Sequence, residues 1–575
     1  MAQRRFIQVL MPLHLEWDPY YSLPEGMEVQ PGMQVKVRLA GRSYYAVVSA
    51  VDVTPPEDIR AKVLQIDEVP EHLPAITPQE LRFWQALADY YLCSVGEVFK
   101  AAYPALRNKA VKRPKPLAPI AAEAQPVPEL SAAQKTALEG IRKGFRQGKT
   151  VLLHGVAGAG KTELYLRLIQ DTLDAGKSVL YLVPEIALSQ QLVQRIAGRF
   201  PEVLLYHSGE TEARRRKVAQ ALQERESYLV MGTRSALLLP HQDLGLIVVD
   251  EEQDNSYKQD APAPRYHARE SSILLAGIHG ARVLLGSETP SLESIYNTEI
   301  GLFSKVDLKE SFNEAGSIRI ALIDTTAEQK KQGMLGSLSK KLIALMHEAL
   351  EAGEQVLMLV PRSWESSLQE ELQTLFPEQR SSIQLASAFS GCLRGPQPGL
   401  VALLGADSLL SRQDFRADER AFQLLEQFRG RCRSTDRPGV FAIQTREAGH
   451  PVFQRLLSGE DHTPALLQER KAFGYPPFTR LIHVQVKDIN PKRCQYHANE
   501  LARMLQNVPE LRGTVMGPFA PALELVNERH IRQIRITLTK DKLLKTRKKL
   551  LVQCISQYEK KTRYEGRITI DVDPL

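Results

Sequence analysis

The sequence predicts an α/β protein organised around a phosphate-binding loop, with a small β-rich segment before that core and an α+β segment after it. The first observation is the motif Gly155–Thr162, which follows the apolar run Val151–Leu153 and opens the amphipathic segment Glu163–Leu173. The second is that apolar strands alternate with amphipathic helices from Leu130 onward, which is typical of an α/β fold. The third is that short polar clusters follow several of these strands, where an open α/β sheet binds ligands.

The central motif supplies the parts of a P-loop. Its glycines Gly155, Gly158 and Gly160 allow backbone N–H groups to close around phosphates at a helix N-terminus, which favours negative charge. Lys161 would reach the β- and γ-phosphates, and the Thr162 hydroxyl would ligate Mg²⁺. A simple glycine turn is the alternative, but the strand before and the helix after favour a nucleotide site.

A second catalytic element follows the apolar run Leu246–Val249, which presents Asp250 and Glu251 at the end of a strand. Asp250 would hold Mg²⁺ through water, and Glu251 would orient or deprotonate the attacking water as a general base. A solvated acidic loop is the alternative. It is disfavoured because the pair follows a buried strand downstream of a P-loop, so the sequence predicts an NTPase.

Length and composition bound the organisation of the chain. Its 575 residues are 43% hydrophobic and 25% charged, which is ordinary for a globular protein and enough for about three to five domains. A formal charge of +7 permits an anionic partner without requiring one. No apolar run approaches the roughly 20 residues of a membrane span, so we expect a cytoplasmic protein without a membrane partner. None of the five cysteines lies in a CxxC pair, so we expect reduced thiols and no zinc.

The segments on either side of the core indicate further domains. Phe6–Leu10, Gln34–Arg38 and Tyr44–Ser49 predict short strands of a small barrel or sandwich, and Pro78–Tyr91 predicts a helix. Residues 107–128 are basic and then rich in Ala and Pro, which indicates an extended linker.

Near the C-terminus, strands and helices alternate in an order that suggests a ferredoxin-like α+β domain. His483–Val486 and Arg532–Leu538 predict strands, and Lys540–Gln557 predicts a basic helix. Arg529 and Arg532, with the lysines of that helix, could form a surface that faces DNA. A solvated helix face is the more common meaning of such a run and stays open as the alternative.

Four longer runs resemble one family. Ala88–Val98, Asp254–Arg269, Asp414–Gln427 and Ile568–Leu575 are similar to segments of the PriA family of replication-restart helicases. The resemblance extends over nearly the whole chain and implies two RecA-like lobes of a superfamily 2 helicase that binds ATP with Mg²⁺. It implies a 3′-DNA-end-binding domain at 1–106, a linker at 107–128, lobe one at 129–305, a reduced lobe two at 306–460 and a C-terminal DNA-binding domain at 461–575.

The resemblance implies further site residues. The nearest candidates for the pocket that holds a 3′ end are Trp17, Asp18, Tyr20 and Tyr21, although such aromatics could simply cover the end of a barrel. Gln134 matches the glutamine that lies near the adenine in such helicases. Together with Ser131 it also forms a capping box, so a plain helix-cap role is equally compatible.

The run after the acidic pair interleaves aromatic rings with cations, which suits stacking and phosphate contact with single-stranded DNA. The residues concerned are Tyr257, Lys258, Arg265 and Tyr266. Tyr266–Arg269 could instead brace the loop that carries Asp250, and the sequence leaves both roles open.

The sequence departs from the family in lobe two. A strand at Gln355–Pro361 passes directly into a helix at Ser366–Phe376 where the family carries a zinc-binding region, and the box that links ATP to DNA is absent, as is the family's winged-helix domain. Arg431 is in register with the last helicase motif. Ser434 stands where the family has the arginine finger for the γ-phosphate, with Arg433 one position early.

Two hypotheses therefore stand. One is a replication-restart enzyme that binds branched DNA at stalled forks, directs primosome assembly and unwinds DNA 3′→5′ with ATP. The other is a fork-recognition scaffold that binds ATP with little or no unwinding. A weaker third is a P-loop ATPase with another substrate. The implied partners are branched and single-stranded DNA, primosome and helicase-loading proteins and single-strand binding protein, and we expect a monomer.

Overall fold

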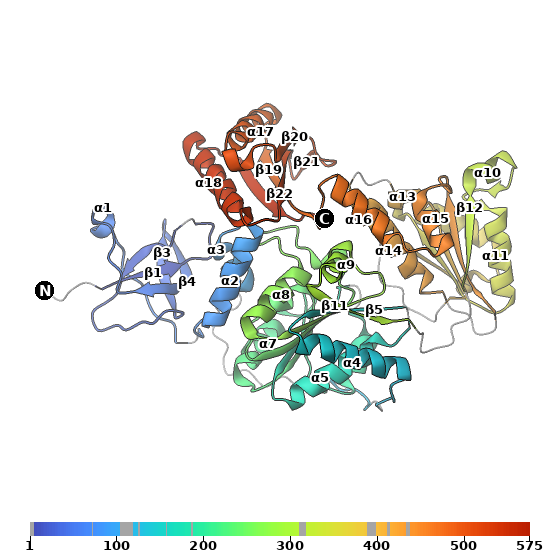
Figure 1. Ribbon diagram of the computed structural model, residues 1–575, viewed down its shortest axis with the longest axis horizontal. Coiled ribbons are helices and arrows are strands. Elements are labelled where there is room, and N and C mark those ends of the chain that lie inside the picture. Colours follow the sequence, from blue (N-terminus) through green and yellow to red (C-terminus); the bar gives the residue numbers. More distant parts are fainter. Residues whose placement is uncertain are drawn as a thin grey trace.

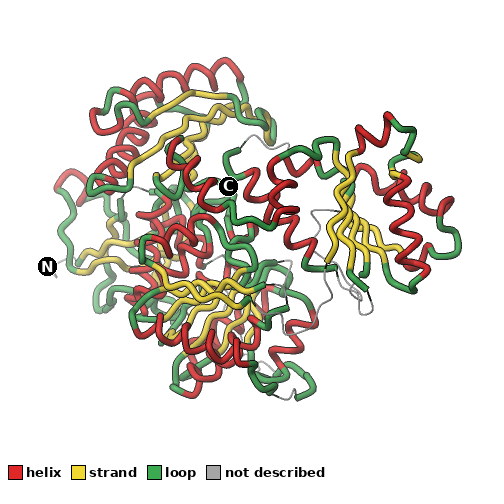
Figure 2. The backbone as a smooth tube through the Cα atoms, turned by 45° about the vertical axis from the view of Figure 1, so that its right-hand side comes forward, coloured by secondary structure: helices red, strands yellow, loops and turns green. Residues whose placement is uncertain are grey.

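The computed structural model describes residues 5–15, 17–71, 73–103, 119–124, 127–156, 158–185, 188–309, 318–387, 398–410, 414–432 and 437–575. Figure 1 shows the N-terminal domain in blue and the C-terminal domain in red beside a first α/β lobe in teal to green. The second lobe, in yellow to orange, lies at the far end from the N-terminus. In Figure 2 the strands of the two lobes form separate twisted sheets.

The N-terminal domain is an antiparallel sheet in the order β2-β1-β4-β3, followed by helices. Its elements are β1 Phe6–Leu10, β2 Tyr20–Ser22, β3 Gln34–Leu39, β4 Arg42–Val51, α1 Glu57–Arg60, α2 Pro78–Tyr91 and α3 Val95–Ala102. Helix α2 begins at a capping box in which Thr77 and Glu80 exchange hydrogen bonds. The strands and the helix predicted from the sequence are confirmed.

Lobe one is a parallel sheet in the order β11-β5-β10-β9-β6-β8-β7. Its strands are β5 Thr150–Gly155, β6 Ser178–Leu182, β7 Leu204–Tyr206, β8 Leu229–Gly232, β9 Leu244–Val249, β10 Arg282–Ser287 and β11 Phe303–Leu308. Its helices are α4 Ala132–Arg146, α5 Lys161–Asp174, α6 Gln190–Ala197, α7 Glu212–Glu224, α8 Ala268–His279 and α9 Leu292–Glu299. Along β6, Val179 and Tyr181 enter one apolar core while Leu180 and Leu182 enter another, so both faces of the sheet are covered.

The boundary between the lobes lies later than the sequence suggested. Strand β11 pairs in parallel with β5 from Phe303 through Leu308, so the sheet of lobe one extends beyond residue 305. The predicted boundary at 305 falls inside β11, because the alternating pattern of an edge strand carries no sign of the sheet that it joins.

Lobe two is a smaller parallel sheet in the order β12-β18-β17-β15-β16. Its strands are β12 Ile318–Asp324, β15 Val356–Val360, β16 Ile383–Ser387, β17 Leu400–Leu403 and β18 Gly439–Thr445, with a short hairpin of β13 Met334–Leu335 and β14 Leu338–Ser339. Its helices are α10 Thr325–Lys330, α11 Lys340–Glu351, α12 Glu365–Leu375, α13 Asp407–Leu410, α14 Ala417–Arg429 and α15 Pro451–Ser458; α16 Thr463–Ala472 leads into the next domain.

The C-terminal domain has the ferredoxin-like topology predicted from the sequence. Its elements are β19 Thr479–Asp488, α17 Pro491–Gln506, β20 Val515–Phe519, β21 Leu525–Val526, β22 Arg529–Thr539, α18 Leu544–Thr562 and β23 Arg567–Val572. The strand order β20-β22-β19-β23 is antiparallel throughout, and the two long helices connect β19 to β20 and β22 to β23. Within the described residues, no helix is both long and apolar enough to cross a bilayer.

Three of the four parts form one body. A single apolar core contains residues of α2, of one face of lobe one and of the C-terminal domain, including Trp84, Leu275 and Ile555. The buried Lys258 ammonium adds a polar link, since it donates to Val572 O at 2.7 Å and lies 2.8 Å from Asp571 Oδ1. Strand β23 is therefore fastened to lobe one.

We predict that replacing Lys258 with Met destabilises the protein by about 3 kcal/mol, because Asp571 would keep a buried charge without its partner. Lys177→Met is the matched control, since Lys177 forms an exposed ion pair with Asp243 and such pairs contribute less than about 1 kcal/mol. Denaturant unfolding of both variants checks the prediction. Equal losses of stability would contradict it.

Candidate functional site

The P-loop lies between β5 and α5, as predicted. Gly160 is the N-cap of α5 with a left-handed φ of 82°, and a Cβ there would lie 2.3 Å from Gln134 Nε2. Gly158 is also left-handed, with φ 71°. Glycine is thus favoured at 160 by the left-handed backbone, while the nearby Gln134 amide would have to shift for any larger residue.

Lys161 is buried at the centre of the site. Its Nζ donates to Gly155 O at 2.9 Å and to Glu288 Oε1 at 3.1 Å, and it lies 3.9 Å from Glu251 Oε1. Thr162 follows at the start of α5 and is half-buried. The sequence placed Glu288 in a polar cluster after a strand but gave it no role; its contact with Lys161 depends on the pairing of β10 with β5.

Gln134 links the helix before the P-loop to the loop itself. Its Oε1 accepts a hydrogen bond from Ser131 N at 3.0 Å, and its Nε2 donates to Ala159 O at 3.1 Å. The capping box is therefore confirmed. The side-chain amide of Gln134 also bonds to the P-loop. Contact of Gln134 with an adenine stays a prediction.

The acidic pair lies at the carboxyl end of β9, beside the P-loop. Asp250 Oδ1 accepts from Tyr165 OH at 3.0 Å, and Glu251 Oε2 accepts from Gln253 Nε2 at 2.8 Å. Burial raises the pKa of Asp250 and raises the pKa of Glu251 to about 8. Glu251 has a left-handed φ of 48°, which turns successive side chains of this loop in different directions.

The charges around Lys161 fit a phosphate ligand with a divalent cation. Lys161 is the single ammonium beside Asp250, Glu251 and Glu288, so the site has an excess of acidic groups. Burial raises the pKa values of Asp250 and Glu251, and the neighbouring carboxylates add to this. Asp250 and Thr162 supply the hard oxygen atoms that Mg²⁺ prefers. The residues present thus suit Mg-ATP.

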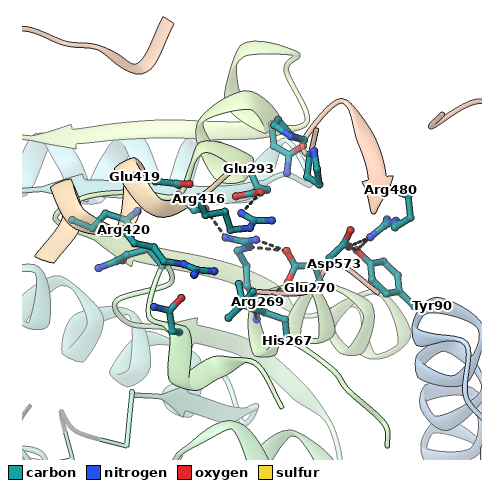
Figure 3. A pocket seen from close by; sticks show the side chains of 18 of the residues that line it. Tyr90, His267, Arg269, Glu270, Glu293, Arg416, Glu419, Arg420, Arg480 and Asp573 are labelled. Atoms are coloured by element: carbon teal, nitrogen blue, oxygen red, sulfur yellow. Dashed lines mark hydrogen bonds and ion pairs between the residues drawn. The ribbon is translucent and has the colours of Figure 1, made fainter. Parts of the chain in front are cut away.

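A second cluster lies where lobe one meets lobe two and the C-terminal domain (Figure 3). The Glu252 carboxylate is fully buried; it accepts from Arg269 Nη1 and from Ser291 N, each at 2.8 Å. Nearby, Glu293 of α9 is paired with Arg416 of lobe two and lies 3.4 Å from Arg470 Nη1 of α16.

The same junction fixes helix α14. Glu419 accepts from Leu292 N at 2.8 Å and pairs with Arg470, while Gln423 donates to Thr289 O at 3.2 Å. Glu419 and Gln423 line a pocket of about 240 Å³, together with Glu293 and Arg416, and the pocket also reaches Tyr90, Arg480 and Asp573. We call the ion pairs of Glu293 and Glu419 with Arg416 and Arg470 the interlobe network.

The predicted DNA contacts after the acidic pair are buried in this structure. Tyr257 and Tyr266 are each 1% exposed and donate to Asp250 O at 2.7 Å and Arg234 O at 3.3 Å. Lys258 and Arg265 point to the C-terminal domain, where Arg265 Nη1 donates to Ile570 O at 3.4 Å. In this structure neither ring is exposed enough to stack on a base, and Tyr257 bonds to the loop that carries Asp250. A contact of these four residues with DNA stays a prediction.

The remaining predicted residues are spread over the molecule. Trp17 is 59% exposed and Asp18 is half-buried at the N-terminal sheet. On β22, Arg529 is half-buried and Arg532 donates to Gln495 Oε1 at 2.6 Å. Arg431 is half-buried just after α14. Ser434, Arg433 and Cys392 lie outside the described residues.

Three family models match the chain. They are the 3′DNA-binding domain (3′BD) at residues 8–104, the DEAD/DEAH box helicase at 131–297 and the primosomal protein N C-terminal domain at 471–575. Replication restart protein PriA of Rickettsia felis is 28% identical over 95% of this chain and 96% of its own length. PriA of Haemophilus influenzae is 30% identical over 75% of this chain and 70% of its own length. RecG bound to a three-way DNA junction matches at a TM-score of 0.41 with 17% identity, over 60% of this chain and 47% of that chain, which supports no inference about function.

Proposed function

We propose that this chain, which belongs to the PriA family of replication restart proteins, binds and hydrolyses Mg-ATP on branched DNA but separates strands weakly or not at all. The helicase-type core follows from the match over residues 131–297. The activity that remains in this chain is the proposal, together with its partners: primosome and helicase-loading proteins and single-strand binding protein. We also propose that it acts as a monomer in the cytoplasm.

The observation that supports ATP hydrolysis is the position of Lys161 beside Asp250 and Glu251 at one edge of the sheet. Lys161 would bind the β- and γ-phosphates, and Thr162 and Asp250 would hold Mg²⁺, which supplies positive charge to the reacting phosphate. Glu251 would take the proton of the attacking water. Its carboxylate lies at the edge of the sheet beside Asp250 and 3.9 Å from Lys161 Nζ, where an attacking water would stand.

The observation that supports weak unwinding lies in the sequence of lobe two. Ser434 stands at the finger position, and the resemblance shows no equivalent of the box that links ATP to DNA. An arginine finger contributes about 10³ to 10⁵ in rate, or about 4 to 7 kcal/mol of transition-state stabilisation. Hydrolysis without these groups would be slow and poorly linked to strand separation.

For nucleotide binding, we expect Lys161→Ala to weaken the affinity for Mg-ATP by about tenfold to a hundredfold, because a charge-assisted hydrogen bond contributes about 1.5 to 3 kcal/mol. Calorimetric titration measures the effect, with Lys177→Ala as a surface control. Absence of binding by the unmodified protein at millimolar Mg-ATP would refute the P-loop assignment.

For DNA, we expect tight binding of a forked duplex that weakens as salt rises, since phosphate contacts release counterions. With saturating ATP, the same fork should be unwound weakly or not at all. Binding and strand separation are measured on one labelled fork with a nascent leading strand. Robust unwinding that is abolished by Lys161→Ala or Glu251→Gln would restore the full helicase assignment.

For metal, we predict no structural zinc, because no pair of cysteines has ligand spacing. Elemental analysis of the purified protein should give far less than one equivalent. One or more equivalents of tightly bound zinc would contradict the prediction, because the zinc would then be held by residues whose spacing in the sequence does not reveal a site.

A further inference from the structure

The carboxylate of Glu288 lies where Lys161 must meet the nucleotide. A lysine ammonium has three N–H donors. Here one donates to Gly155 O at 2.9 Å and one to Glu288 Oε1 at 3.1 Å, while the remaining side faces Glu251 at 3.9 Å. A phosphate oxygen can use the donor that bonds to Glu288 only after Glu288 gives up its contact.

We propose that Glu288 competes with the phosphates of ATP for Lys161, so that it sets the affinity of the site for nucleotide. This inference rests on the ATP binding proposed above. It concerns a residue outside the P-loop and outside the acidic pair, and it gives Glu288 the function of holding Lys161 in place while no nucleotide is present.

Electrostatic repulsion opposes the binding of Glu288 and of a phosphate to Lys161 at the same time. The contact between Lys161 and Glu288 is mostly buried, with side-chain exposures of 9% and 28%, so it is poorly screened by solvent. A polyphosphate at Lys161 would stand beside the Glu288 carboxylate and repel it. Glu288 therefore moves away when ATP binds, and the free energy of its bond to Lys161 is subtracted from that of ATP binding.

The position of Glu288 also links this competition to lobe two. Glu288 directly follows β10, and the carbonyl of the next residue, Thr289, accepts a hydrogen bond from Gln423 of α14 at 3.2 Å. Two residues further on, Ser291 is held by Glu252. The segment that contains Glu288 is therefore bonded to α14. A shift of lobe two would move this segment and change the strength of the contact between Glu288 and Lys161.

The experiment uses the full chain without DNA and the non-hydrolysable probe Mg-AMPPNP. Calorimetry gives its Kd for the unmodified protein, for Glu288→Gln and for Glu288→Ala. We expect Kd to fall by about tenfold in Glu288→Ala and by a smaller factor in Glu288→Gln, because a neutral amide is a weaker partner for an ammonium than a carboxylate.

Glu426→Gln is the matched control. Glu426 lies on α14, pairs with Arg429 rather than Lys161, and is close enough to Glu288 for that carboxylate to contribute to its raised pKa, after burial. It removes one negative charge from the same surroundings, so its Kd should change by less than about twofold if contact with Lys161 is what matters. Thermal unfolding without nucleotide confirms that each variant is folded.

The results distinguish a failure of the competition by Glu288 from a failure of the proposed ATP site. Binding by the unmodified protein with an unchanged or weakened Kd in both Glu288 variants would overturn the competition, and a weakened Kd would assign Glu288 to binding instead. An equal gain in Glu426→Gln would also overturn it, because the effect would then be one of overall charge. No binding in any folded protein would refute the proposed ATP site itself.

Discussion

The interlobe network is the constraint on which the arrangement of this protein depends. Glu293 stands between Arg416 of lobe two and Arg470 of the helix that leads to the C-terminal domain, and the opposing charges hold its pKa far below the usual range despite burial. Buried charges of this kind contribute little net stability when paired but are costly when one partner is lost. The lobes and the C-terminal domain are therefore held in the one geometry that pairs every charge.

The nucleotide site has the opposite electrostatic character. Its acidic groups outnumber the single ammonium of Lys161, and burial raises the pKa of Asp250 and Glu251 rather than lowering it. At the nucleotide site the carboxylates outnumber the cations, whereas each carboxylate of the interlobe network has an arginine partner. This contrast separates a site that accepts a charged ligand from a junction that maintains structure.

Sequence patterns predicted the elements of this protein better than the contacts between them. The P-loop, the capping box at Ser131 and the ferredoxin-like order of the C-terminal domain follow from local periodicity and turn chemistry, and the structure has them. The surroundings of Lys258 and Tyr257 could not be predicted in the same way. Lys258 Nζ donates to Val572 O of β23, 314 positions later in the chain, and Tyr257 OH donates to Asp250 O across the turn of the acidic loop.

The contact between Glu288 and Lys161 escaped prediction for a related reason. It joins residues 127 positions apart that meet only because β10 pairs with β5. A polar cluster after a strand indicates an edge of the sheet where ligands bind, but it does not tell which side chain faces which. Register within a parallel sheet decides that, and it is set by long-range packing.

A strained turn connects the nucleotide site to the interlobe network. Glu251 faces Lys161, whereas its neighbour Glu252 is buried against Arg269 and Ser291, and the left-handed backbone at Glu251 makes this divergence possible. Such a conformation costs about 1 kcal/mol or more in a residue other than glycine. It persists because the buried bonds of Glu252 over-determine it. The general base is therefore presented to the nucleotide by bonds that Glu252 makes within lobe one. Ser291, one partner of Glu252, adjoins Leu292, whose backbone N–H donates to Glu419 of α14. A movement of lobe two that disturbs this contact would therefore reach Glu251 through Ser291 and Glu252.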